Sequence, residues 1–267
     1  LSFEGVAGTF RLGWGDGGAD RSHVYATLGG FPILEIPLFN SENKWLVGGQ
    51  LGTNLRFNDG ADHLRIGAAY YDFMHVTGIR NSPDSTLQNF TAPAFVRYGN
   101  DLFDISNISD LDQSANLFGL ASHFRLVDIA GNYEHGFGRY SLAFTAEGVR
   151  NIGFNLNEVN ALLPTPLPGK ENTGYVGEVS FGRPVVDEFN KWRIALGYRY
   201  VKRDAVLDAW TDADFHEGGT NAEGFYVWGS YGLAKNTWVR VRYMSSNEID
   251  GPRYGLDILQ VDINARF

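Results

Sequence analysis

The feature that most constrains the fold is a regular alternation of apolar and polar residues over stretches of about ten to fourteen residues. In the stretch that begins at Trp192, every second position up to Tyr200 is apolar or aromatic, and Arg193 and Arg199 lie between them. Residues 256–267 repeat the pattern. Successive side chains of a β-strand point to opposite faces. Each stretch therefore predicts a strand with one apolar face and one polar face.

The same pattern predicts eleven strands and very little helix. The strands are long compared with the five or six residues usual in soluble sheets. They match a tilted membrane-crossing strand of about nine to eleven residues together with its rims. One short loop helix is expected at 156–164. The expected strands are 3–14, 22–36, 44–58, 62–76, 116–127, 138–151, 172–184, 190–203, 223–234, 236–248 and 256–267.

Composition excludes several classes of protein. The chain has 267 residues and nothing that reads as a linker, so we expect a single domain over 1–267. The absence of cysteine excludes a disulfide scaffold and a thiolate metal site. A net charge of −9 argues against a nucleic-acid partner, whose phosphates need a basic face. No apolar run approaches the roughly 18 residues of a membrane-spanning helix.

Two observations favour a transmembrane β-barrel over a soluble β-sandwich, whose strands would also alternate. Arginine occurs in the middle of many polar faces, which suits a water-filled lumen. Aromatic residues gather at strand ends, as in the girdles that flank the lipid-facing band of a barrel. They are Trp14, Trp45, Trp192, Trp238, Tyr140, Tyr175, Tyr200 and Phe267. We therefore expect an all-β, antiparallel, up-and-down β-barrel that crosses a membrane.

Loop lengths orient the expected barrel. Short connections near 58–62, 136–138, 183–190 and 234–236 alternate with longer polar segments. The longer segments are 77–115, 152–171, 204–222 and 249–255. Short turns on one side and long loops on the other are typical of outer-membrane barrels, in which the short turns are periplasmic.

Several segments carry a resemblance to a known family. A C-terminal strand that ends in Phe267 resembles the assembly signal of Gram-negative outer-membrane barrels. Five further segments resemble a group of proteobacterial putative porins. They are 44–52 (KWLVGGQLG), 67–72 (GAAYYD), 204–215 (DAVLDAWTDADF), 232–237 (GLAKNT) and 247–252 (NEIDGP). The similarity extends from about residue 28 to the end. It implies a bacterial outer-membrane location, insertion by the barrel assembly machinery, contact with lipid and lipopolysaccharide, and a homotrimer.

The predicted strand count leaves two alternatives. Eleven is odd, and counting back from Phe267 would place Leu1 outside the cell. Either 92–103 supplies a twelfth strand, or the chain is the C-terminal part of a larger barrel of about 16 strands. Members of the resembled family are longer chains, so we favour the second alternative, with the remaining strands supplied by an upstream segment or a separate chain.

The polar faces of the predicted strands define a candidate pore lining that is basic, although the chain is acidic. Rings of charged side chains set the selectivity of pores, so this wall favours weak anion preference. The alternative is that the arginines pair with carboxylates and only hold the wall together. The predicted pore-lining residues are Arg56, Arg65, Arg125, Arg139, Glu147, Glu178, Arg193, Arg199, Arg240, Arg242 and Asp262, with Arg11 and Arg266 also on the inward positions.

An acidic stretch follows the strand expected at 190–203. It contains Asp204, Asp208, Asp212, Asp214 and Glu217 and lacks lysine and arginine. The spacing differs from an EF-hand loop, which needs a central glycine and a terminal bidentate glutamate. Three interpretations stay open: a solvated loop, a cation-binding loop that links to lipopolysaccharide, or a constriction folded into the lumen.

Catalytic patterns are sparse. The six histidines are scattered without paired metal-ligand spacing, and no G-x-S-x-G elbow occurs. Ser122 and His123 are adjacent, but neighbours on a strand point to opposite faces. We expect no enzyme activity and no cofactor. The expected function is a passive diffusion channel for small hydrophilic solutes. The alternative is a non-conducting barrel that anchors partners in the outer membrane.

Overall fold

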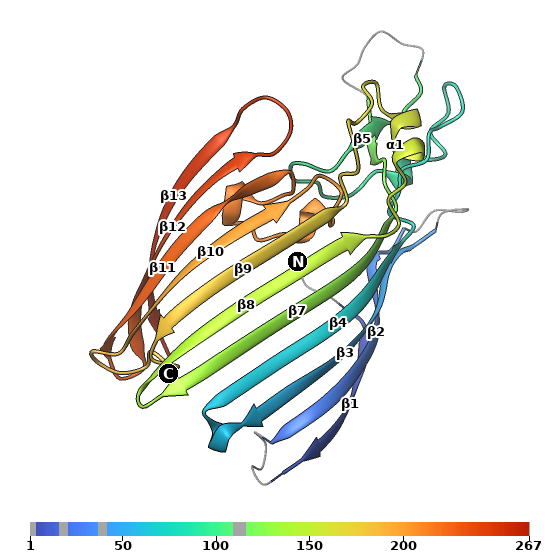
Figure 1. Ribbon diagram of the computed structural model, residues 1–267. Helices are drawn as coiled ribbons and strands as arrows, with labels where there is room; N and C mark the ends of the chain where they lie inside the picture. The colour runs from blue at the N-terminus through green and yellow to red at the C-terminus, as the bar shows by residue number, and fades with distance from the viewer. Residues whose placement is uncertain (1–3, 16–20, 37–41, 109–115, 267) are drawn as a thin grey trace.

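The computed structural model describes residues 4–15, 21–36, 42–108 and 116–266. Eleven strands form one antiparallel sheet in the order β1-β2-β3-β4-β7-β8-β9-β10-β11-β12-β13, a meander in which each strand pairs with the next strand of the sheet (Figure 1). The strands are β1 (Val6–Trp14), β2 (Ser22–Leu34), β3 (Lys44–Phe57), β4 (Asp62–Met74), β7 (Phe124–Phe137), β8 (Tyr140–Asn151), β9 (Thr173–Gly182), β10 (Trp192–Val201), β11 (Ala222–Ala234), β12 (Thr237–Glu248) and β13 (Gly255–Ala265). The expected all-β antiparallel architecture is confirmed.

The region between β4 and β7 differs from the prediction. The strand expected at 116–127 is wrong: β6 (Phe118–Leu120) ends before a bend, and β7 begins at Phe124. A twelfth strand at 92–103 is also absent from the described sheet. Instead β5 (Leu102–Asp104) pairs with β6 in a separate two-stranded sheet. Helix α1 (Leu156–Leu162) lies within the expected 156–164, and the Asn155 side chain caps it by accepting a hydrogen bond from the Asn157 N–H at 3.1 Å.

The connections divide by length between the two ends of the sheet. The turns between β3 and β4, β7 and β8, and β11 and β12 are short and lie at one end. The long segments, with β5 and α1, gather at the other end, hereafter the loop end (Figure 1). The β9–β10 connection, predicted at 183–190, runs from Arg183 to Lys191 at the same end as the short turns, and its Asn190 N–H donates to the Gly232 carbonyl at 3.1 Å.

Strand register separates the side chains of the sheet into two faces. Directly opposed residues of antiparallel strands share a face. One face, hereafter the outer face, carries exposed apolar side chains from β2 through to β13. In mid-strand they are Leu28, Leu51, Ile66, Ile129, Phe144, Val179, Leu196, Val227, Val241 and Leu259. An uninterrupted apolar surface of this extent is unusual on a soluble monomer.

Aromatic rings frame this apolar band. Near the short turns, Phe137, Tyr140, Phe181 and Trp192 pack together with ring centroids 5.7–5.9 Å apart. Near the loop end, Tyr175 stacks on Tyr200 at 5.1 Å. Trp238 is an exception among the predicted girdle residues, because its register with Asn264 places it on the opposite face, with Arg240. The two aromatic groups match the interface belts of a membrane barrel.

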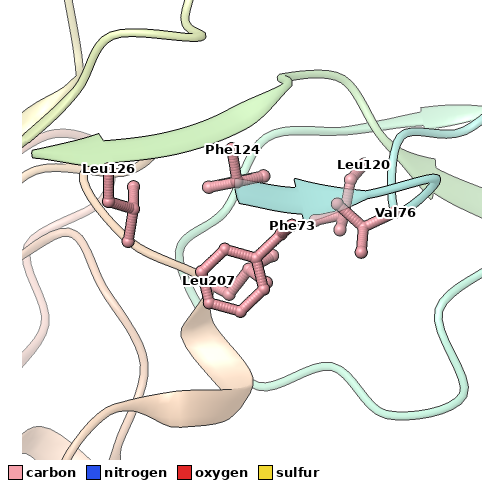
Figure 2. Close-up of a cluster of buried hydrophobic side chains, with 6 residues drawn as sticks. All are labelled: Phe73, Val76, Leu120, Phe124, Leu126 and Leu207. Atoms are coloured by element: carbon pink, nitrogen blue, oxygen red, sulfur yellow. The ribbon is translucent and has the colours of Figure 1, made fainter. Parts of the chain in front are cut away.

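The buried apolar core lies at the loop end. Phe73, Val76, Leu120, Phe124, Leu126 and Leu207 form one cluster, shown in Figure 2, in which Leu207 comes from the segment after β10. A second cluster joins Phe103, Ile105 and Phe154 to Val159 of α1. The loops are therefore packed structures. They stabilise one end of a sheet whose middle has no apolar partner layer within the described part of the chain.

The sheet is open in the described residues: β1 and β13 are its edges, and no pairing joins them. Closure into a barrel and the size of that barrel stay predictions. Among the described residues, no helix is long and apolar enough to cross a membrane.

One glycine of β10 makes room for a neighbouring ring. A Cβ added at Gly197 would overlap the ring and hydroxyl of Tyr226 on β11. Replacing Gly197 with valine is therefore expected to lower the unfolding free energy by about 1–3 kcal/mol, the usual cost of overpacking. Gly177 of β9 has open space around its Cβ position, so Gly177→Val is the matched control and is expected to be neutral. Urea unfolding of the refolded protein measures both effects; equal effects would contradict the prediction.

Candidate functional site

The face opposite the apolar band, hereafter the inner face, is covered at its loop end by residues 202–221, hereafter the acidic segment. Two ion pairs join the segment to the sheet. Asp212 lies 4.0 Å from the Arg199 guanidinium on β10, and Asp214 lies 3.5 Å from that of Arg242 on β12. The segment therefore folds back over the inner face.

Apolar side chains anchor the acidic segment. Phe215 is buried against Ala222 and Met244, and the Arg199 guanidinium lies 5.3 Å from the centroid of its ring. Trp210 packs edge-on against Phe73 with centroids 6.0 Å apart. The apolar residues thus hold the segment on the sheet, while Asp212 and Asp214 stay half-exposed beside Arg199 and Arg242.

Three hydrogen bonds, each with at least one backbone partner, join the acidic segment to the long loop before β7. The Arg97 N–H donates to Asp208 Oδ2 at 2.7 Å. Asn100 Nδ2 donates to the Arg203 carbonyl at 2.6 Å, and the Thr220 N–H donates to the Tyr98 carbonyl at 2.8 Å. These contacts join residues more than a hundred positions apart and fix the segment over the inner face.

The five predicted acids of this segment separate into three environments. Asp204 and Asp208 are buried. Asp212 and Asp214 face the wall arginines, and Glu217 is exposed at the rim. In the part of the chain that the structure describes, no group of three or more histidine or acidic side chains could hold a metal ion.

Most of the predicted pore-lining residues share the inner face. Arg56, Arg65, Glu147, Glu178, Arg193, Arg199, Arg240, Arg242 and Asp262 all fall on it by register. Phe267, the predicted assembly signal, lies outside the described residues.

The structure places the other two pore-lining candidates elsewhere. Arg125 lies on the outer face, opposite Asp72, with its Nε 3.8 Å from that carboxylate. The strand expected at 116–127 placed Arg125 inward, but β7 begins only at Phe124, and Phe124 and Leu126 take the inner positions, in the buried cluster of the loop end. Arg139 lies in the two-residue turn between β7 and β8 and is exposed, so it belongs to neither face.

Several charges of the inner face already have partners. Arg193 Nη1 lies 3.2 Å from Glu134 Oε1, and its Nη2 donates to Ser180 Oγ at 2.9 Å. Glu178 accepts a hydrogen bond from Trp228 Nε1 at 3.0 Å. The Arg240 guanidinium lies 4.8 Å from the centroid of the same indole ring.

The sequence reasoning missed three residues of this site: Tyr226, Trp228 and Phe215. Tyr226 and Trp228 stand at the positions of β11 that face inward, next to Ser230. An aromatic residue at a polar-face position of a predicted strand was the signal that could have found them. Phe215 was marked only by being apolar within an acidic stretch.

A buried pair of carboxyl groups holds the base of the acidic segment. The Asp101 N–H donates to Asp204 Oδ1 at 3.1 Å, and Asp101 forms an ion pair with Arg203 at 3.2 Å. One carboxyl oxygen of Asp101 and one of Asp204 are buried without a hydrogen-bond partner among the described residues. Burial first, and then the neighbouring carboxylate of Asp101, raise the pKa of Asp204 well above its usual value.

Loop-end stability is therefore expected to fall as the pH rises. The folded state holds the proton on Asp204 more tightly than the unfolded chain, so it binds more protons between the unfolded pKa, 3.8, and the raised folded pKa. The contribution of Asp204 to stability is then full below pH 3.8. It declines by about 1.4 kcal/mol for each rise of one in pH until the folded pKa is passed. Hydrogen exchange of the Asp204 and Ala121 amides from pH 4 to 9 measures this decline.

Asp204→Asn is expected to flatten this pH profile, because the amide is neutral at every pH. Asp212→Asn, at the half-exposed carboxylate paired with Arg199, serves as the control and should keep the wild-type slope. A wild-type profile that rises with pH would contradict the assignment to the buried pair.

Comparison with known proteins identifies the family of the chain. A family model described as putative porin matches residues 1–267, the whole chain. The chain belongs to the putative porin family. Membership confirms the resemblance found in the sequence and gives the chain a porin-like, outer-membrane role in general terms. A comparison with curated proteins gave no match.

Proposed function

We propose that this porin-family chain forms the wall of a passive diffusion channel for small hydrophilic solutes in a bacterial outer membrane, with weak preference for anions. The observation that carries the proposal is the division of the sheet into two faces. An apolar band framed by aromatic belts covers the outer face, and charged and amide side chains cover the inner face. Family membership supports the same function.

Charge placement on the outer face supports contact with lipid. In the described strands, the charged side chains of this face stand only near strand ends: Asp62, Asp72, Arg125, Arg150, Glu223 and Asp257. Charge is costly at the bilayer midplane and tolerated near its interfaces. The band between the ends is therefore suited to hydrocarbon.

A closed wall in the membrane needs partners for β1 and β13. Unpaired backbone groups in hydrocarbon cost several kcal/mol each. The two edge strands are the first and eleventh of an antiparallel meander, so they run in the same direction. An odd number of further strands between them would close an all-antiparallel ring, and the proposal includes such strands.

The proposed anion preference follows from the arginines of the inner face. The preference is weak because carboxylates pair with several of these arginines. Among the described residues, Arg65 and Arg240 form no ion pair with a carboxylate, whereas Arg193, Arg199 and Arg242 are each paired with one. The paired arginines contribute little net field to the lumen. The acidic segment narrows the proposed channel at the loop end, and its carboxylates oppose the positive charge of the wall arginines.

Planar-bilayer recording of the purified full-length protein tests the proposal. We expect stable ohmic conductance in KCl and a reversal potential under a salt gradient that indicates a modest excess of chloride flux. Clear cation selectivity would overturn the anion preference. A folded, inserted protein that passes no current would overturn the channel and favour a non-conducting anchor barrel.

A further inference from the structure

Two cavities on the inner face meet at one tryptophan. The upper cavity, of about 380 Å³, lies under the acidic segment and is lined by Glu147, Glu178, Arg199, Asp212, Arg242 and Trp228, among others. The lower cavity, of about 190 Å³, lies toward the short turns and is lined by Arg193, Trp228, Trp238, Arg240 and Arg266, among others. The upper volume is within the range of small-molecule sites and has room for about a dozen waters.

The upper cavity has a surplus of negative charge. Its two arginines are already paired, Arg199 with Asp212 and Arg242 with Asp214. Glu147 and Glu178 form no ion pair within the described part of the chain. Glu178 is held in place by the indole N–H of Trp228, which donates to its Oε2 at 3.0 Å. Two carboxylates are thus available to a positively charged group.

The lower cavity has a surplus of positive charge. Arg193 is paired with Glu134, and Asp187 with Lys191 at 2.7 Å. Arg240 and Arg266 form no ion pair among the described residues, although Asp262 lies opposite Arg240 on β13. Ser230 Oγ accepts from Arg240 Nε at 2.9 Å, which fixes the guanidinium against the face of Trp228.

One charged residue of each cavity contacts the Trp228 ring. Glu178 contacts the edge of the Trp228 indole, and Arg240 stacks on the same ring at 4.8 Å from its centroid. A solute whose ammonium and carboxylate are several bonds apart can satisfy both groups at once. A singly charged solute of the same length can satisfy only one of the two groups and leaves the other without a counter-charge.

We propose that Trp228 marks a binding site for zwitterionic solutes with separated charges, such as short peptides and ω-amino acids. The ammonium group lies by Glu147 and Glu178, the carboxylate lies by Arg240 and Arg266, and the carbon chain lies along the indole. This proposal deepens the channel function and rests on it.

Current block by three matched solutes tests the site. 6-Aminohexanoate, hexanoate and hexylammonium are added at equal concentrations and neutral pH to the full-length protein in a KCl-filled bilayer. The zwitterion is expected to block at about a five-fold lower concentration than either singly charged solute. Glu178→Gln and Arg240→Gln should each remove that advantage, whereas Glu178→Asp and Arg240→Lys should retain most of it.

The controls separate this proposal from the channel itself. Arg150→Gln changes a charge on the outer face and should leave the block unchanged. A protein that conducts KCl and is blocked equally by all three solutes overturns the zwitterion site and leaves the channel standing. A folded protein without KCl conductance overturns both. Glutamine variants that conduct normally and keep the full zwitterion advantage also overturn the site.

Discussion

Replacing Asn151 with alanine is expected to cost about 3 kcal/mol or more of loop-end stability. The side chain is fully buried. Its Nδ2 donates to the carbonyls of His123 at 2.8 Å and Asp204 at 2.9 Å. Its Oδ1 accepts from the N–H groups of Arg125 at 3.1 Å and Gly153 at 3.0 Å. Each buried backbone group left unpaired costs about 1–3 kcal/mol.

The effect should extend to the acidic segment, because Asn151 joins the start of β7 and the end of β8 to Asp204. Hydrogen exchange measures the local loss of stability, by comparing the Asp204 and Gly153 amides with amides in the middle of β10. Asn155→Ala removes only the cap of α1 and should cost about 1 kcal/mol with no effect on Asp204. Asn151→Asp keeps the acceptor but turns a carboxylate oxygen toward the two carbonyls in a buried site, so it should cost at least as much as Asn151→Ala. Equal protection of the Asp204 amide in the wild type and in Asn151→Ala would refute the role of Asn151 in holding the acidic segment.

Strand positions could largely be predicted from the sequence, and the exception shows what alternation cannot decide. Ten of the eleven expected strands overlap a strand of the sheet along most of their length. β7 runs through Gly131 and Asn132, two residue types that are typical of turns. Gly131 falls on the outer face, and Asn132 on the inner face donates to Thr145 Oγ1 at 2.9 Å. Misplacing this strand also put Arg125 on the wrong face.

The arrangement of the acidic segment could not be predicted in the same way. Alternation is a local property, whereas this segment is positioned by contacts between distant residues, such as Asp101 with Asp204 and Arg97 with Asp208. The alternation of apolar and polar residues along a strand does not predict such contacts. The apolar residues within the acidic stretch, Leu207, Trp210 and Phe215, were the only sequence indication that it packs against something.

Replacing Phe144 with arginine is expected to destabilise the membrane-inserted protein by about 2–4 kcal/mol. Phe144 lies in the middle of β8 on the outer face, half-exposed and opposite Tyr133 and Val179 of the adjacent strands. In the proposed orientation its ring contacts hydrocarbon, and a guanidinium there must either leave its strand position or draw water into the bilayer. Urea unfolding from vesicles of defined thickness measures the change.

The adjacent residue supplies the control. Thr145 lies on the inner face of the same strand, opposite Glu178 of β9. Thr145→Arg adds the same charge at the same depth, next to a carboxylate and in water, so it should cost less than about 1 kcal/mol. In a sheet with water on both faces, the two arginines would differ little. Equal costs would therefore argue against membrane insertion of this sheet.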